Sequence, residues 1–380
     1  MNGKRRVLTF YPSAKMGGAF KVHCRLLEAA LHEGWEVHYI STQEFPLPDS
    51  GRVHFHPVKW PFGDGILFYV YFRCILALKV LYLVLGGRFD LIVSSCETLS
   101  AVSSVGKTLA GVPLFTLVQG YLPVFERSKG FSPVVKWICR VLGTIGLYFS
   151  DTVCCVSHDL AERIRSHYVT RSNIEVIHNY IDMGHYSVVG STEFRSELGL
   201  DDDTYLIGYL GRLVPLKNVE FLLESFDCME YKDARLTIVG DGPEKTKLVE
   251  IAKRKNIFER THFVSYRDDV PDIMRSLDLL VLPSFHEACP LVLLEALGSG
   301  TVCLGSRRGG IPEILKYDEL LFNLDNPQKL GENIDRLASD SGYRSQVKKL
   351  SGKRRKAMRV DWEPLMMKAL RRCARRPLQL

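Results

Sequence analysis

The chain lacks the signals that would assign it to a cysteine-metal, repeat-containing or exported class of protein. Its 10 cysteines are scattered and form no Cys-x-x-Cys pair, so the spacing of a cysteine metal site is absent. No low-complexity tract and no internal repeat stands out. No signal peptide opens the chain, because the first residues lead straight into a strand-like run. A reducing, cytoplasmic location is therefore expected.

The basic charge is concentrated at one end of the chain. The net charge is +7, and residues 348–380 hold 12 Lys and Arg against Asp361 and Glu363. This tail is either a solvated helix face or a segment attracted to anionic lipid head groups. No aromatic platform accompanies the charge, so nucleic acid is not an expected partner.

One apolar segment is long enough to be tested as a membrane span. Residues 65–87 read GILFYVYFRCILALKVLYLVLGG, and Arg73 and Lys79 interrupt the run, which is costly at bilayer depth. The segment also lies where an α/β domain needs a crossover helix. We expect a partly buried helix that touches a membrane surface. The stretch 129–148, with Lys136, Trp137 and Arg140, suits the same surface.

Short apolar runs alternate with helical segments in both halves of the 380-residue chain. The runs that read as buried parallel strands are 6–10, 36–41, 91–94, 114–118, 152–157, 205–210, 235–239, 261–263, 279–282 and 302–305. This alternation predicts an α/β protein with doubly wound, Rossmann-like sheets. We place one domain at 1–185, a second at 186–355, and a helix with a basic tail at 356–380.

Two carboxylates lie in the segment Glu287-Ala-Cys-Pro-Leu-Val-Leu-Leu-Glu295. Pro290 suits the first turn of a helix, so Glu287 is expected in the loop before it and Glu295 inside it. Amides at the helix start can face an anion, while the carboxylates bind sugar and ribose hydroxyls. The spacing alone favours an ordinary loop residue and an ordinary helix-face residue.

Glycine-containing motifs follow several of the expected strands. In Gly211-Arg212-Leu213-Val214-Pro215-Leu216-Lys217, the two cations stand at a strand end, where they can neutralise a diphosphate. Gly240-Asp241-Gly242-Pro243-Glu244 is either a structural turn or a ligand contact. Gly309-Gly310-Ile311-Pro312-Glu313 has mainly a structural role. Gly17-Gly18, after the first strand, is either a simple turn or a close approach to phosphate.

Together these motifs resemble a known family in order and spacing. The chain resembles the GT-B family of retaining glycosyltransferases called family 4, or glycosyl transferases group 1, strongly over 205–320 and more loosely over 1–185. Asp361-Trp362-Glu363 and the following helix resemble the terminal helix that crosses back onto the N-domain. The resemblance implies two Rossmann-like domains facing a cleft, the first binding the acceptor and the second a nucleotide-sugar.

The resemblance also implies roles for individual residues. Arg212 and Lys217 would bind the donor diphosphate and stabilise it as leaving group, Glu287 would contact the donor sugar, and Glu295 would hold the ribose. Gly18 would approach the diphosphate from the other domain. The further donor-binding residues are Gly17, Gly211, Tyr266, Arg267, Cys289, Pro290, Leu291 and Val292.

One position departs from the family pattern. Family members often carry a His after the strand equivalent to 114–118, where it contacts the donor sugar near the reaction centre, and this chain has Gln119. Gln can form hydrogen bonds but cannot carry a cation. Gln119 is therefore either a polar catalytic-site contact or a sign of altered activity.

The resemblance implies transfer of a hexose-type sugar with retention, from a UDP- or GDP-sugar and without a cofactor or metal. No Asp-x-Asp metal signature stands in a convincing context. The expected acceptor is a glycan or lipid-linked precursor at the inner face of an anionic membrane, in polysaccharide or lipid-linked glycan synthesis. A nucleotide-sugar epimerase is one alternative, which the set of motifs opposes. A non-catalytic, transferase-like partner subunit is the other, which Gln119 suggests and Arg212, Lys217, Glu287 and Glu295 oppose.

Overall fold

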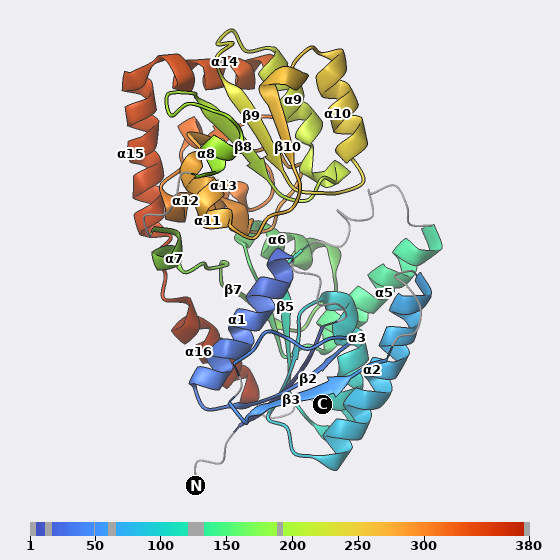
Figure 1. The fold of residues 1–380 in the computed structure, drawn as a ribbon. Helices are drawn as coiled ribbons and strands as arrows, with labels where there is room; N and C mark the ends of the chain where they lie inside the picture. The colour runs from blue at the N-terminus through green and yellow to red at the C-terminus, as the bar shows by residue number, and fades with distance from the viewer. Residues whose placement is uncertain are drawn as a thin grey trace. The chain divides into compact units, whose positions relative to one another are not determined.

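The computed structural model describes residues 5–11, 17–48, 50–59, 66–120, 133–187 and 193–375. The chain forms two compact units (Figure 1): unit 1 is Met1–Asn179 with Asp361–Leu380, and unit 2 is Tyr180–Val360. The boundaries expected from the sequence, after 185 and after 355, lie within a few residues of these divisions. Residues 65 and 129–132 of the two segments expected at a membrane lie outside the described residues.

Unit 1 is built on a sheet of seven parallel strands in the order β3-β2-β1-β4-β5-β6-β7. The strands are β1 (Arg6–Phe10), β2 (Glu36–Ser41), β3 (Val53–Pro57), β4 (Leu91–Ser94), β5 (Leu114–Val118), β6 (Thr152–Cys155) and β7 (Asn173–Val176). Its helices are α1 (Gly18–His32), α2 (Ile66–Gly86), α3 (Glu97–Ala110), α5 (Pro133–Phe149), α6 (His158–His167) and α16 (Trp362–Ala374).

Unit 2 is built on a sheet of six parallel strands in the order β10-β9-β8-β11-β12-β13. The strands are β8 (Leu206–Leu210), β9 (Arg235–Val239), β10 (Thr261–Val264), β11 (Leu279–Leu282), β12 (Val302–Ser306) and β13 (Leu321–Phe322). Its helices are α7 (Met183–Ser187), α8 (Glu193–Glu197), α9 (Val219–Asp227), α10 (Lys245–Arg254), α11 (Val270–Ser276), α12 (Leu291–Ser299), α13 (Ile311–Leu315), α14 (Pro327–Ser339) and α15 (Ser341–Ala357), with short 3₁₀ turns η1 (Pro215–Lys217), η2 (Phe258–Arg260) and η3 (Asp318–Leu320).

The two sheets repeat one topology. In each, the third, second and first strands are followed by the fourth and fifth, so the strand order reverses between β1 and β4 and between β8 and β11. Ligands of doubly wound sheets bind beyond the carboxyl ends of the strands at this reversal. The predicted pair of Rossmann-like domains is confirmed. The edge strands β3 and β7 were not predicted, because they are only partly buried and lack a continuous apolar run.

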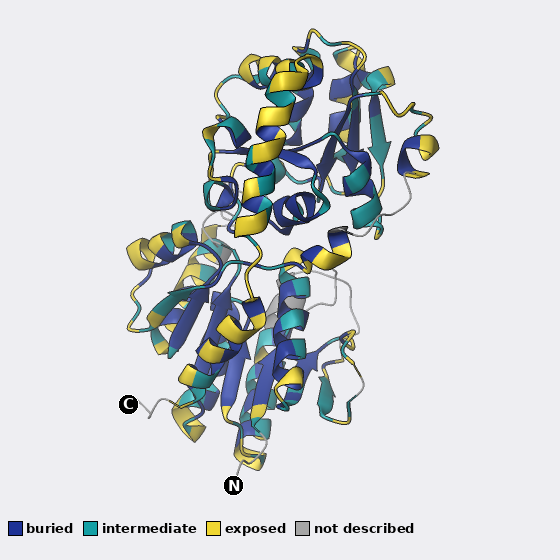
Figure 2. Cartoon of the chain, turned by 90° about the vertical axis from the view of Figure 1, so that its left-hand side faces the viewer, coloured by how far each residue is buried: buried dark blue, intermediate teal, exposed yellow. Residues whose placement is uncertain are grey.

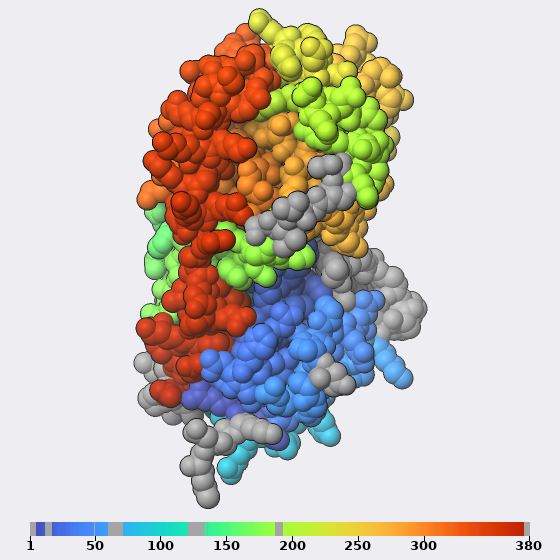
Figure 3. All heavy atoms as spheres, turned by 60° about the vertical axis from the view of Figure 1, so that its left-hand side comes forward, coloured from blue at the N-terminus to red at the C-terminus, as the bar shows by residue number. Residues whose placement is uncertain are grey.

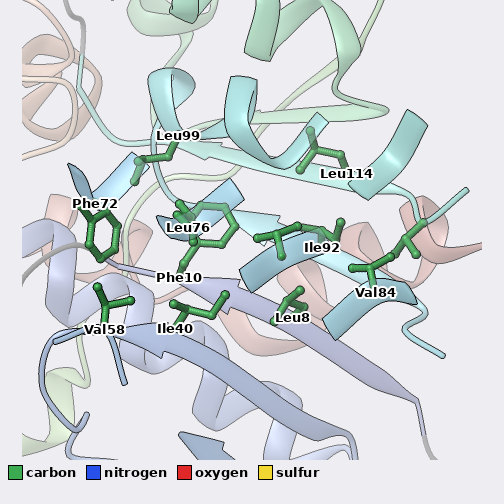
Figure 4. Close-up of a cluster of buried hydrophobic side chains, with 12 residues drawn as sticks. Leu8, Phe10, Ile40, Val58, Phe72, Leu76, Val84, Ile92, Leu99 and Leu114 are labelled. Carbon is green, nitrogen blue, oxygen red and sulfur yellow. The ribbon is translucent and has the colours of Figure 1, made fainter. Parts of the chain in front are cut away.

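The core of unit 1 lies between its sheet and α2 with α3 (Figure 4). Leu8, Phe10, Ile40 and Ile92 meet Phe72, Leu76 and Val84 there. Helix α2 thus buries one stripe at helical spacing, as a crossover helix should. Among the described residues, no helix is both long enough and apolar enough to cross a membrane. In both units the central strands are buried while the covering helices expose their outer faces (Figure 2).

The terminal helix α16 belongs to unit 1, as the family resemblance implies. It packs against α1, β4 and β5, and it buries Trp362, Met366 and Leu370. Figure 3 shows its red surface against the blue of the first helix. Arg371 pairs with Glu33, and Arg372 pairs with Glu175 at 2.9 Å. Part of the basic tail is therefore used to dock this helix rather than left to solvent.

Candidate functional site

The first loop of the site follows β8, at the reversal of strand order in unit 2. Gly211 ends the strand with a φ of +153°, and Gly240 after β9 has a φ of +141°. A Cβ on Gly240 would lie 2.0 Å from the carbonyl oxygen of Gly211, and one on Gly242 would lie 2.2 Å from that of Leu213. Only glycine permits such approaches. The turn at 240–244 therefore has a structural role, which is to support the loop carrying Arg212.

The second loop follows β11 and meets the first through an ion pair. The Lys217 ammonium donates to the Glu287 carboxylate, and both side chains are largely buried. The Ser284 hydroxyl donates to the same Glu287 oxygen at 3.0 Å. The backbone of Glu287 is held by the glycine loop after β12, since its carbonyl accepts from the Gly310 amide at 2.8 Å. A Cβ on Gly309 would lie 2.2 Å from that carbonyl oxygen, so this loop has the structural role we predicted.

Arg212 is an exposed cation, and a hydrogen bond from a buried side chain holds its backbone in place. The buried Tyr209 hydroxyl donates to the Arg212 carbonyl at 3.0 Å. Burial and the nearby Glu287 charge raise the pKa of Tyr209 well above its usual range, so the phenol stays protonated and keeps donating. Within the described part of the chain, the Arg212 guanidinium has no protein partner. It is thus available to an anion at the strand ends.

Helix α12 begins just after the second loop. Pro290 is its N-cap residue rather than its first helical residue, a shift of one position from the prediction. Cys289 and Leu291 are buried, and Val292 is half-buried. Within the part of the chain that the structure describes, no side chain caps this terminus. The first amides of the helix therefore remain open to an anionic group, as helix starts generally allow.

Glu295 lies inside α12 and is buried, at 7% exposure. Its Oε1 accepts a hydrogen bond from the Tyr186 hydroxyl at 3.0 Å, and Tyr186 belongs to α7, which packs against α12. A buried carboxylate needs such a partner. The predicted spacing is therefore realised with one carboxylate in a loop and the other anchored within the helix.

The residues expected near the base lie after β10. The Tyr266 side chain is more than half exposed, and its hydroxyl donates to Asp268 at 2.6 Å. The Arg267 guanidinium is committed to two carboxylates: it pairs with Asp269 at 2.6 Å and with Glu197. Tyr266 thus offers an open aromatic face, while the charge of Arg267 is already neutralised.

In unit 1 the structure brings Gln119 next to the first glycine loop. The Gln119 Nε2 donates to the carbonyl of Ala19, in the first turn of α1, at 3.0 Å. Gly17 is the N-cap of this helix, and among the described residues, which omit 12–16, no side chain caps it and nothing lies within 4 Å of a Cβ placed on it. The open space at Gly17, the start of α1 at Gly18 and the Gln119 amide therefore form one polar edge of the sheet.

A buried histidine under this edge was not predicted. His23 on α1 is fully buried, and burial lowers its pKa to about 3. The Thr9 hydroxyl donates to the Val93 carbonyl at 2.9 Å, so the His23 Nε2 donates to Thr9 at 3.2 Å and its Nδ1 accepts from Ser95. This neutral ring ties α1 to the ends of β1 and β4.

Two families match the chain over nearly its whole length. The family described as "Glycosyltransferase Family 4" matches residues 16–185, and the one described as "Glycosyl transferases group 1" matches residues 190–354. The first match falls in unit 1 and extends a few residues into unit 2, and the second falls in unit 2.

Relatives and solved structures extend this likeness. The N-acetyl-alpha-D-glucosaminyl L-malate synthase of Bacillus anthracis is 26% identical over 82% of this chain and 81% of its own. The UDP-Gal:alpha-D-GlcNAc-diphosphoundecaprenol alpha-1,3-galactosyltransferase of Escherichia coli is 25% identical over 86% of each chain. The structure of Anabaena Alr3699/HepE in complex with UDP and glucose has a TM-score of 0.77 at 18% identity, over 97% of this chain and 98% of that one, and shows a shared fold.

Proposed function

Because the chain belongs to glycosyltransferase family 4, the GT-B enzymes that use nucleotide-sugar donors, we propose that it moves a hexose with retention from a UDP- or GDP-sugar to an acceptor hydroxyl. The observation that carries the proposal is the Lys217–Glu287 pair, which stands with the open Arg212 cation at the strand-order reversal of unit 2. The epimerase alternative is disfavoured by the family membership.

In the proposed reaction, the acceptor oxygen bonds to the anomeric carbon as the bond from that carbon to the diphosphate breaks. The acceptor hydroxyl loses its proton, and the diphosphate takes it. Negative charge grows on the leaving diphosphate, so Arg212, Lys217 and the first amides of α12 bind the transition state more tightly than the ground state. These fixed charges supply the stabilisation that a metal ion provides in other transferases, which supports a metal-independent reaction and requires no cofactor.

The other site residues take binding roles in this proposal. Glu287 binds a hydroxyl of the transferred sugar, and Lys217 orients its carboxylate. Glu295 holds the ribose through the oxygen that Tyr186 leaves open. Tyr266 borders the base with its exposed ring, whereas Arg267 orders that loop through its two ion pairs. Cys289, Pro290, Leu291 and Val292 line the sugar through their backbone.

In this proposal unit 1 contributes to donor binding through its polar edge. The open space at Gly17 and the start of α1 at Gly18 let the backbone approach the diphosphate. Gln119 makes a polar contact with the donor sugar through its amide oxygen, since its Nε2 is held by Ala19. In this proposal Gln119 takes the role of the family's frequent His, as a hydrogen-bonding group without charge.

For the acceptor, we propose a lipid-linked glycan reached at an anionic membrane. Helix α5 exposes an apolar stripe at helical spacing, in which Trp137 is 65% exposed, with Lys136 and Arg140 beside it. Helix α2 exposes a second stripe that includes Tyr82, at 77%. Apolar residues flanked by cations suit the surface of an anionic bilayer. The relative from Escherichia coli, whose name specifies a diphosphoundecaprenol acceptor, supports this class of substrate.

The test of the transfer is nucleotide release. Purified protein is incubated with UDP-, GDP- and ADP-sugars, with and without lipid extract, and the freed nucleoside diphosphate is measured. We expect release from one donor and a large loss in Lys217→Ala and in Glu287→Ala. No release from any donor, with nucleotide binding intact, would support the non-catalytic partner subunit instead.

The membrane contact is tested separately with liposomes. We expect flotation with anionic vesicles at low salt, weakened by the double variant Trp137→Ser/Val141→Ser. The matched control is Val169→Ser, which alters an exposed apolar residue of unit 1 outside both stripes. Equal flotation of all three proteins, or none with any, would remove the membrane surface from the proposal.

A further inference from the structure

A cluster of imidazoles lies on β2 and β3, the two strands at one side of the unit 1 sheet. Glu36 and His38 lie on β2, and His54 and His56 lie on the edge strand β3. The strands are parallel and pair His38 with His54. Residues two apart on a strand share a face, so all four side chains project to the same side of the sheet.

Three atoms of this cluster converge at metal-ligand separations. Glu36 Oε1 lies 2.9 Å from His54 Nε2 and 3.4 Å from His38 Nε2. All three ligand atoms lie within 4.8 Å of one another. Two ligands of a tetrahedral zinc ion are about 3.4 Å apart, given Zn–N and Zn–O bonds of about 2.1 Å. The separation from Glu36 to His38 matches that value, and the separation from Glu36 to His54 is 2.9 Å, the length of a direct hydrogen bond that a bound ion would widen.

The groups around the three ligands already hold them in place. His38 Nδ1 lies 3.1 Å from His56 Nε2, and His38 Nε2 lies 3.4 Å from Glu36 Oε1, which accepts its hydrogen. A cation that binds at Nε2 takes the place of that hydrogen, and the ring hydrogen then moves to Nδ1, where His56 Nε2 can accept it. Arg6 donates to Glu36 Oε2 at 2.9 Å, which turns Oε1 toward the imidazoles. The edge of Phe89 packs on the His38 ring, with centroids 5.0 Å apart. Second partners of this kind orient the ligands of protein metal sites.

We propose that Glu36, His38 and His54 form a binding site for a zinc-type divalent cation. Two imidazoles and one carboxylate suit Zn²⁺, whereas Mg²⁺ and Ca²⁺ prefer ligand sets made of oxygen. His54 is 41% exposed on its side chain, which leaves an entry path and room for a water as fourth ligand. The site lies at the start of β2, away from the strand ends that bind substrate. Its role is therefore to fasten the edge strand β3 to the sheet, independently of the transfer reaction.

The test is zinc binding by the full chain after treatment with a chelator. Zn²⁺ is titrated in competition with a chromophoric indicator, and we expect one tightly bound ion per chain. His54→Ala and His38→Ala should each weaken binding at least tenfold. His56→Phe should weaken it by about tenfold to a hundredfold, through lost orientation of His38. Substituting Co²⁺ gives an independent readout, because its visible spectrum reports the ligand geometry.

A surface histidine outside the cluster provides the control. His167→Ala, on α6, should bind zinc like the unaltered protein. Zinc should raise the Tm of the unaltered chain and of His167→Ala but not of His54→Ala, while all three have the same Tm in chelator. If His54→Ala and His38→Ala bind zinc as tightly as the unaltered chain, or if no protein binds it, the cluster is only a hydrogen-bonded network and the proposal is wrong.

Discussion

The two units present the same strand topology but build their polar edges differently. In unit 2 the site side chains are fixed by one another: Lys217 holds Glu287, Tyr209 holds the Arg212 backbone, and Tyr186 holds Glu295. In unit 1 the edge consists of backbone at Gly17 and one amide side chain, Gln119.

The comparison shows why the motifs of the two halves differ in strength. A loop that holds charged side chains in fixed positions must keep their partners and the glycines beneath them, so unit 2 carries several recognisable motifs. A loop that works through its backbone constrains few side chains. Unit 1 accordingly resembles the family more loosely.

The largest effect should come from breaking the central pair of unit 2. Lys217→Ala should lower kcat about 10²- to 10³-fold, because a fixed cation at the leaving group is lost. In the Lys217→Ala/Glu287→Gln double variant, kcat should fall by less than the product of the factors for the two single variants, because the residues act as one unit. The test is the turnover of the best donor by both single variants and by the double variant.

An exposed ion pair of the same unit serves as the control. Lys247 pairs with Glu220 on the surface, so Lys247→Ala should leave kcat unchanged. Strictly multiplicative losses for the central pair would show that Lys217 and Glu287 act separately.

Replacing glycine by alanine should change the stability of the protein differently in the two glycine loops. Gly240→Ala should destabilise unit 2 by about 3 kcal/mol or more, since its Cβ would overlap the Gly211 carbonyl. Gly17→Ala should change the free energy of unfolding by less than about 0.5 kcal/mol and affect only donor binding. All 4 tryptophans lie in unit 1, so their fluorescence follows that unit, and hydrogen exchange follows unit 2. Equal stability of both variants would contradict the backbone contact.

Acid should destabilise unit 1 through its buried histidine. His23 stays neutral in the folded state because burial lowers its pKa from 6.5 to about 3, whereas the unfolded chain takes up the proton near 6.5. The unfolded state thus binds more protons below pH 6.5, and stability falls as the pH falls toward 3. The loss should be about 2 kcal/mol between pH 6.5 and 5, at about 1.4 kcal/mol per pH unit.

Urea unfolding followed by tryptophan fluorescence, in chelator, measures this slope. His38 adds to it in the same direction, because burial lowers its pKa to about 4. His23→Gln should therefore reduce the slope without abolishing it. If His23→Gln keeps the full pH dependence of the unfolding free energy, His23 is not the group that causes it.

The smallest effect should come from the polar edge of unit 1. Gln119→Ala removes one hydrogen-bonding group and should lower kcat/KM about tenfold, equivalent to about 1.4 kcal/mol. Gln119→His should retain most of the activity if the position needs only a polar contact. Steady-state kinetics with the best donor decide this, and a loss as large as that of Lys217→Ala would show that the two units contribute equally.

The sequence predicted the longer buried strands and the charged loops because both leave a local pattern, but it missed the buried β13, which has only two residues. It did not predict β3 or β7, whose partial burial breaks the apolar run. Tyr209, Tyr186 and Ser284 were also missed, because their role depends on hydrogen bonds to residues placed by the fold.

The histidines were missed for related reasons. His23 sits in an ordinary apolar helix pattern, and only its full burial distinguishes it. Glu36-x-His38 and His54-x-His56 do show the spacing of a shared strand face. That signal could have been found, but it needed β3 to be recognised as a neighbour of β2.

The docking of α16 has a consequence for how the protein is made. The ribosome completes unit 2 before it synthesises the helix that covers α1, β4 and β5. At about 5–20 residues per second, the rest of unit 1 waits roughly 10–40 s for that helix. During this interval an apolar face stays uncovered in the nascent chain, so limited proteolysis of chains ending before Asp361 should cut unit 1 faster than unit 2. The first unit to be translated is thus the last to be finished.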